Sequence, residues 1–83
     1  MKMSVELSCY PLNEDYIPVI KDFINKINQT EGVRAITNTL STQLFGESEI
    51  IFPLLESAMT STWHTQGKAI FVCKFLKGDL SPE

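Results

Sequence analysis

Little in this sequence could build a catalytic or metal site. His64 is the only histidine, Cys9 and Cys73 are far apart and form no CxxC pair, and the four glycines are isolated. Zinc and redox sites need clustered ligands or paired thiols, and phosphate-binding loops need closely spaced glycines. The sequence therefore predicts a protein that is not an enzyme and that carries no metal or cofactor of its own.

Positive charge and long apolar runs are also scarce. The net charge is −3, and lysine and arginine form no cluster. Nucleic acids and anionic membranes attract basic surfaces, so neither is expected as a partner. A run of about 18 apolar residues is missing, so no transmembrane span is expected. The N-terminal residues alternate instead of forming the apolar core of a signal peptide, which predicts a cytoplasmic protein.

The chain does contain the pattern of one small domain, residues 1–83, with enough apolar residues for a single core. Apolar residues at strand spacing predict strands at 3–10, 33–39, 41–45 and 68–76. Apolar residues three and four positions apart predict two helices between them. The two stripes are Ile17, Ile20, Phe23, Ile24 and Ile27, then Ile51, Leu54, Leu55 and Ala58.

The ends of these helices are predicted from capping residues. Asp15 and Ser48 can accept hydrogen bonds from the free N–H groups of a first helical turn. Gly32 and Gly67 suit the C-terminal ends. The final residues, 79–83, are expected to be disordered.

The order β-α-β-β-α-β predicts an α+β fold, the ferredoxin-like sandwich. Its four-stranded antiparallel sheet has the strand order 4-1-3-2, and both helices cover one face. Antiparallel pairing of the first and last strands then puts Cys9 and Cys73 at opposite ends of the ladder, roughly 10 Å apart at about 3.4 Å per residue. We therefore expect two free thiols.

The last strand, KAIFVCKFL, is apolar on both faces. A solvated face of an antiparallel sheet normally alternates with polar residues, so the face away from the helices is expected to be covered. Another copy of the domain is the simplest cover, which predicts a homodimer or homotetramer formed through the sheet. On the second helix, Phe52, Met59 and Trp63 form a further stripe. They either flank the core, contact a neighbouring copy, or stack on a ligand.

Polar residues gather in two places. Glu6 and Ser8 lie on the face of the first strand that the oligomer should cover, where a carboxylate needs a partner. Either the sheet face is wet at Glu6, or Glu6 meets a Lys or Arg across the interface, or it binds a cationic or amine-bearing ligand. The stretch TNTLSTQLFGE holds further hydroxyl and amide groups. Threonine there serves strand propensity, but the other groups suit a small heteroaromatic such as an aminopyrimidine. The hairpin candidates are Thr37, Asn38, Ser41, Thr42 and Gln43.

Four segments in order, SVELSCYPL, EDYIPVIKDFINKIN, TNTLSTQLFGE and GKAIFVCKFLKG, resemble the YkoF-type thiamine-binding family. The resemblance covers about residues 4–78. It implies a ferredoxin-like domain that pairs through its sheet. It also implies binding of thiamine or its hydroxymethylpyrimidine moiety in vitamin uptake or salvage. By matching motif positions, the implied ligand-binding residues are Glu6, Ser8, Thr37, Asn38, Ser41, Thr42 and Gln43.

Two other functions stay open at this stage. One is a homo-oligomeric scaffold or partner-binding module whose polar groups only line the interface between copies. The other is a small dimeric α+β enzyme of the oxygenase or isomerase kind, for which His64 is the only candidate base. Binding of thiamine, of the pyrimidine alone or of neither would separate these readings.

Overall fold

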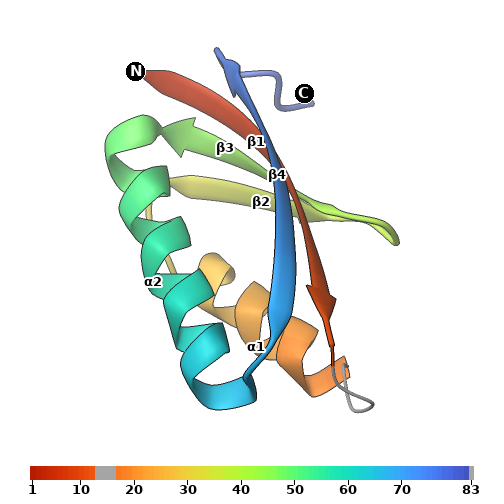
Figure 1. Cartoon of the computed structure of the whole chain (residues 1–83). Helices are drawn as coiled ribbons and strands as arrows, with labels where there is room; N and C mark the ends of the chain where they lie inside the picture. The colour runs from red at the N-terminus through yellow and green to blue at the C-terminus, as the bar shows by residue number, and fades with distance from the viewer. Residues whose placement is uncertain (13–16, 83) are drawn as a thin grey trace.

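The computed structural model describes residues 1–12 and 17–82. Its elements are β1 (Lys2–Pro11), α1 (Ile17–Asn28), β2 (Val33–Thr37), β3 (Thr42–Glu47), α2 (Ser48–Gln66) and β4 (Ala69–Lys77). The strands form one sheet in the order β2-β3-β1-β4, with every neighbouring pair antiparallel. Both helices lie on the same face of that sheet (Figure 1). The predicted ferredoxin-like fold and strand order are confirmed.

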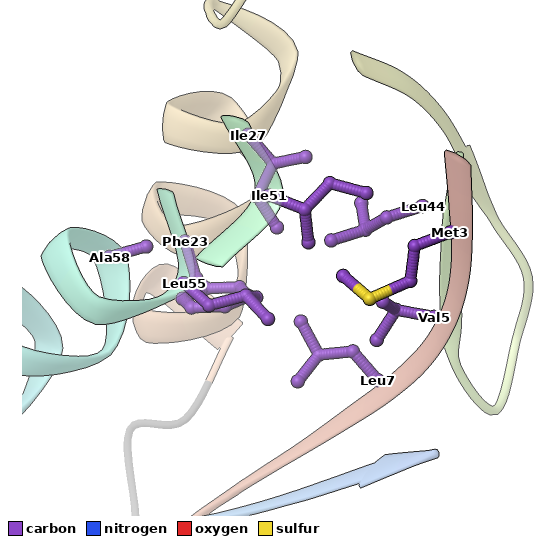
Figure 2. Packing of buried hydrophobic residues seen from close by; sticks show 9 residues of the cluster. All are labelled: Met3, Val5, Leu7, Phe23, Ile27, Leu44, Ile51, Leu55 and Ala58. Atoms are coloured by element: carbon purple, nitrogen blue, oxygen red, sulfur yellow. The ribbon is translucent and has the colours of Figure 1, made fainter. Parts of the chain in front are cut away.

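The core lies between the helices and the sheet (Figure 2). Alternate residues of β1 point to the helices because strand side chains have a period of two. Residues three or four positions apart on α2 meet them. Each large side chain buried in this way contributes about 1.5–3 kcal/mol to stability. The cluster comprises Met3, Val5, Leu7, Phe23, Ile27, Leu44, Ile51, Leu55 and Ala58.

The first helix follows its predicted stripe. Phe23 and Ile27 are buried and Ile20 and Ile24 are half-buried, whereas the proposed cap Asp15 and the side chain of Ile17 lie outside the described residues. The predicted C-terminal glycine was placed too late. The helix ends at Asn28, and Gly32, with φ of 84°, instead forms the turn into β2.

The second helix begins differently from the prediction. Ser48 is its first residue and not its cap, and the flanking Glu47 makes no side-chain capping bond. The Ser48 N–H instead donates to the Met1 carbonyl at 2.8 Å, a partner remote in sequence. At the other end, the predicted glycine is confirmed. Gly67 has φ of 81° and donates its N–H to the carbonyl of Trp63.

The β2–β3 hairpin is shifted relative to the predicted strands. The second strand ends at Thr37 and the third begins at Thr42, leaving a four-residue turn between them. The Asn38 N–H donates to the Ser41 carbonyl at 2.8 Å across this turn. The tip residue Leu40 is 88% exposed. The turn therefore takes residues 38 and 39 out of the predicted second strand.

The C-terminal residues also differ from the prediction, because 78–82 pack on the outer face of the sheet, opposite the helices. The Ser4 hydroxyl donates to the Gly78 carbonyl at 2.7 Å and accepts from the Leu80 N–H at 3.0 Å. Farther along, Arg34 on β2 donates to the Pro82 carbonyl at 2.8 Å. This segment, the C-terminal strap, covers the end of the sheet where β1 starts.

Both cysteines are free, as predicted, but their spacing along the ladder was overestimated. Cys73 pairs with Leu7 and Cys9 pairs with Phe71, so the two thiols are offset by two positions and are not at opposite ends. On α2, Trp63 packs edge-on against Phe71 and donates its Nε1–H to the Ala69 carbonyl at 2.8 Å. These contacts place Trp63 at the flank of the core.

Candidate functional site

The candidate ligand-binding residues fall on both faces of the sheet. Thr42 faces the helices with Leu7 and Leu44, and Thr37 pairs directly with Thr42 across the hairpin. Their hydroxyl oxygens are 3.3 Å apart. The opposite, outer face carries Glu6, Ser8, Ser41 and Gln43. A single flat platform of all these polar groups is therefore excluded.

A pocket nevertheless joins the two faces where the sheet splits. The β1–β3 ladder ends at the pair Leu7 and Thr42, but β1 continues to Pro11 beside β4. The β2–β3 turn diverges from β1 beyond that point. The resulting pocket has a volume of 490 Å³ and lies between the end of β1, the hairpin turn and α1. Six of the seven candidates line it: Glu6, Ser8, Thr37, Asn38, Ser41 and Thr42.

The split also leaves main-chain groups of β1 facing the pocket. In an antiparallel strand, successive residues bond alternately to the two neighbouring strands. Gly78 donates to the Lys2 carbonyl and Leu12 donates to the Lys68 carbonyl, so even-numbered residues of β1 bond toward β4. Cys9 therefore directs its N–H and C=O toward the β3 side, two residues past the end of that ladder. They form a donor and an acceptor side by side on the pocket wall.

Glu6 is engaged within the chain. Its Oε2 accepts from the Ser41 hydroxyl at 3.2 Å, and its Oε1 is 3.5 Å from the Nζ of Lys74 on β4. The Glu6 side chain is 43% exposed and that of Lys74 is 80% exposed, so this ion pair is bathed in water and weak. The alternative that a lysine meets Glu6 is thus realised within one chain.

The hairpin turn is fastened to β1 a second time. The Ser8 hydroxyl donates to the Leu40 carbonyl at 3.3 Å, which spans the gap left by the missing ladder. Together with the bond from Ser41 to Glu6, it holds the turn at a fixed distance from β1. The opening of the pocket on the outer face therefore has a defined width.

Gln43 does not line this pocket. It lies at a second hollow of 440 Å³ on the outer face. Lys74 and Leu76 of β4 and Leu80 of the C-terminal strap also line this hollow. Glu6 borders both hollows. Gln43 faces the opposite side of the sheet from Thr42, and the described lining that holds the other six candidates does not include it.

The apolar half of the pocket was absent from the sequence-based site. It consists of Leu7 and of Ile20, Phe23 and Ile24 from α1, with Cys9 beside them. Burial raises the pKa of the Cys9 thiol, so at neutral pH the group is a neutral thiol. The apolar stripe of α1 was the available signal, but nothing in it distinguished pocket wall from core.

Groups that could hold a metal ion are absent among residues 1–12 and 17–82, where no three His, Cys, Asp or Glu side chains converge. His64 is exposed on α2 and is not part of the pocket lining. None of the helices described combines the length and apolar character needed to cross a membrane. The described lining residues thus supply hydroxyls, one side-chain amide, one carboxylate, main-chain groups and an apolar wall.

Comparison with known proteins identifies the family. The profile of the YkoF-related family matches residues 2–78. The chain belongs to this family. No curated protein gives a significant match to this YkoF-related chain.

Solved structures share the fold of this YkoF-related domain. Protein SP2199 from Streptococcus pneumoniae is 24% identical, with a TM-score of 0.87 over 96% of this chain and 90% of its own. A candidate thiamine biosynthesis or salvage protein, TM0486 from Thermotoga maritima, is 20% identical, with a TM-score of 0.80 over 98% of this chain and 85% of its own. Protein MJ1052 from Methanocaldococcus jannaschii is 18% identical, with a TM-score of 0.81 over 98% and 84%.

Proposed function

We propose that this chain is a non-catalytic, cytoplasmic binding protein for thiamine or its hydroxymethylpyrimidine moiety, acting in uptake or salvage of the vitamin. One observation carries the proposal. The pocket at the split between β1 and β3 gathers six polar candidates from two distant segments against an apolar wall. Membership of the YkoF-related family and the description of the Thermotoga neighbour point to the same vitamin.

The pocket suits an aminopyrimidine physically. Its 490 Å³ falls within the range of small-molecule sites, which are mainly apolar with a few convergent polar groups. A flat ring would pack against Phe23 and Leu7. Its ring nitrogens and amino group would meet hydroxyls that both donate and accept, such as those of Thr42 and Ser41. The N–H and C=O of Cys9 offer a matching donor and acceptor pair.

Glu6 supplies the charge preference of this site. Its carboxylate lies where the pocket meets the outer face, and the side chain of its partner Lys74 is exposed. An incoming thiazolium or protonated amine can take the place of Lys74 without leaving either charge buried. Glu6 would then face the positive part of the ligand.

Two features support binding without catalysis. A covalent mechanism needs an activated nucleophile next to a base. The pocket's only thiol, Cys9, has its pKa raised by burial, and none of the described lining residues is a histidine. The enzyme alternative rests on His64, which is exposed on α2. We therefore place this chain with carriers or sensors of the vitamin.

We further propose that two or more copies associate through the outer face of the sheet. Three apolar side chains on β4 support this: Ile70, Val72 and Leu76 are each about half exposed on the face away from the helices. Light scattering should give at least twice the monomer mass of 9.4 kDa. Val72→Asp should lower that mass to the monomer value, whereas Ser57→Asp on the exposed side of α2 should not. A monomeric wild-type chain at micromolar concentration would refute this association.

The decisive experiment is calorimetric titration of the chain with thiamine and with hydroxymethylpyrimidine. We expect saturable heat with a stoichiometry of one ligand per chain, weakened by Thr42→Val, which keeps the side-chain shape and removes the hydroxyl. Thr60→Val, on the exposed side of α2, is the matched control. An absence of heat at millimolar ligand, with the oligomer intact, would favour the scaffold function.

A further inference from the structure

We propose that the pocket discriminates by charge and accepts its ligand only in the unphosphorylated form, rejecting thiamine monophosphate and diphosphate. This inference rests on the proposed function, because it names the chemical state of the ligand that the same site takes. It follows from the residues that line the pocket, from the position of the lysine that contacts Glu6, and from the charge of Glu6.

The pocket wall offers no positive charge. Among its described lining residues there is no lysine, arginine or histidine, and the one acidic side chain is that of Glu6. The tetrapeptide 13–16, which precedes α1, reads Asn-Glu-Asp-Tyr and contains no cation in its sequence. Proteins hold phosphate with arginine or lysine, with glycine-rich turns, or with helix N-termini. None of the described lining residues is a glycine, and those that belong to α1 are Ile20, Phe23 and Ile24, which have hydrocarbon side chains.

The cation that contacts Glu6 is already engaged and lies outside the described pocket lining. Lys74 borders the second hollow of the outer face, not the pocket, and its Nζ is 3.5 Å from Glu6 Oε1. Drawing Lys74 to a phosphate would take it from Glu6 and leave that carboxylate beside a ligand of the same sign. A cationic or neutral ligand meets no such conflict.

A phosphate ester would therefore lose affinity relative to the free alcohol. If the phosphate remains in water, the ligand enters the pocket less deeply. If the phosphate enters the pocket, it lies next to Glu6, which has a charge of the same sign. We expect thiamine to bind at least tenfold more tightly than its monophosphate and diphosphate. Exposed charges are screened by salt, so this ratio should shrink when the ionic strength rises from about 0.01 M to about 1 M.

The test titrates the wild-type chain with thiamine, thiamine monophosphate, thiamine diphosphate and inorganic pyrophosphate. A charge is then added with Thr39→Lys, and Thr39→Gln serves as the uncharged control of similar length. Thr39 is exposed and lines the pocket from the hairpin turn. We expect Thr39→Lys to tighten binding of the diphosphate about threefold or more while thiamine itself weakens or stays unchanged. Because Thr39→Gln changes the lining without adding charge, the gain for the diphosphate is measured relative to this variant.

Each outcome decides the matter. Equal or tighter binding of the phosphate esters by the wild type overturns the inference and leaves the proposed function standing. If Lys74→Met then abolishes that binding, the lysine was the phosphate anchor. A preference for thiamine that Thr39→Lys and salt leave unchanged means that shape and not charge discriminates, which also overturns it. If none of the thiamine compounds binds, the proposed function fails and this inference fails with it.

Discussion

The hydroxyl of Ser41 donates to Glu6 Oε2 at 3.2 Å, joining the β2–β3 turn to β1 just where their shared ladder ends. Through this bond, a change at Ser41 affects both the hairpin turn and Glu6 on β1, and both of these line the pocket. Among the side-chain bonds of residues 1–12 and 17–82, the one that would still hold the turn to β1 runs from the Ser8 hydroxyl to the Leu40 carbonyl, at 3.3 Å. The pair thus belongs to the geometry of the site as well as to its polarity.

Replacement of Ser41 by alanine should weaken thiamine binding about 2- to 10-fold, the equivalent of one ordinary hydrogen bond of about 0.5–1.5 kcal/mol. The change frees Glu6 Oε2 and loosens the turn, but it leaves the core untouched. Calorimetry would measure the effect. Ser57→Ala, a serine exposed on α2, is the control and should bind as the wild type does. Identical affinities for both variants would remove Ser41 from the site.

The two cysteines provide an internal comparison for ligand protection. Cys9 lines the pocket and Cys73 does not, while burial raises the pKa of both thiols. A raised pKa leaves less thiolate at pH 8, so both should alkylate more slowly than in the denatured chain, and their rates should keep rising above the pH at which ordinary thiols level off. Saturating thiamine should slow iodoacetamide labelling of Cys9 only, as read by peptide mass spectrometry. Equal slowing at Cys73 would indicate general stabilisation and not occupancy of the pocket.

A core substitution tests the packing in Figure 2. Leu44 is fully buried between the sheet and the helices, whereas Leu40 is 88% exposed at the tip of the hairpin. Leu44→Ala should lower the free energy of unfolding by about 2–5 kcal/mol, because it removes buried hydrocarbon and leaves a cavity. Leu40→Ala removes the same atoms from water and should change it by less than about 0.5 kcal/mol. Urea denaturation measures both, and a similar loss from the two would contradict the described core.

Gly46 on β3 lies where the backbone of the turn between α1 and β2 approaches this strand. A Cβ atom added there would come within 2.7 Å of the Gly32 carbonyl oxygen, which belongs to the backbone and not to a flexible side chain. Gly46→Ala should therefore destabilise the fold by about 1–3 kcal/mol, as overpacking does. Thermal unfolding followed by circular dichroism would show the loss. A variant as stable as the wild type would mean that the turn at Gly32 relaxes freely.

Local periodicity was enough to predict the fold. The alternation of Val5 and Leu7 and the helical spacing of Phe23 and Ile27 each report a buried face, and the order of elements leaves few topologies. Helix starts were less predictable, because the Ser48 N–H is satisfied by Met1, a contact that exists only after folding. Long-range contacts of this kind have no signature in the local sequence.

The sequence predicted most of the polar residues that line the pocket, but it did not predict the shape of the pocket. The motif residues brought together by the structure include Ser8 and Thr42, which no local pattern connects. The pocket exists because the β1–β3 ladder stops at Leu7 while β1 runs on beside β4, and the length of a ladder is a tertiary property. Strand alternation alone could not have separated Gln43 from the other candidates, since Glu6 faces the same side of the sheet and still lines the pocket. The apolar wall could not have been assigned, because Phe23 serves the core as well.

The first and last strands are neighbours, and Gly78 hydrogen-bonds to the Lys2 carbonyl at 2.9 Å at one end of the sheet. The pocket lies beyond the other end of the β1–β3 ladder. Figure 1 shows the start of β1 and the end of β4 at the same end of the sheet. A short peptide can therefore join them, and the chain can be reopened at the exposed Gly67 between α2 and β4. Such a circularly permuted protein keeps every strand pair and leaves the split between β1 and β3 undisturbed.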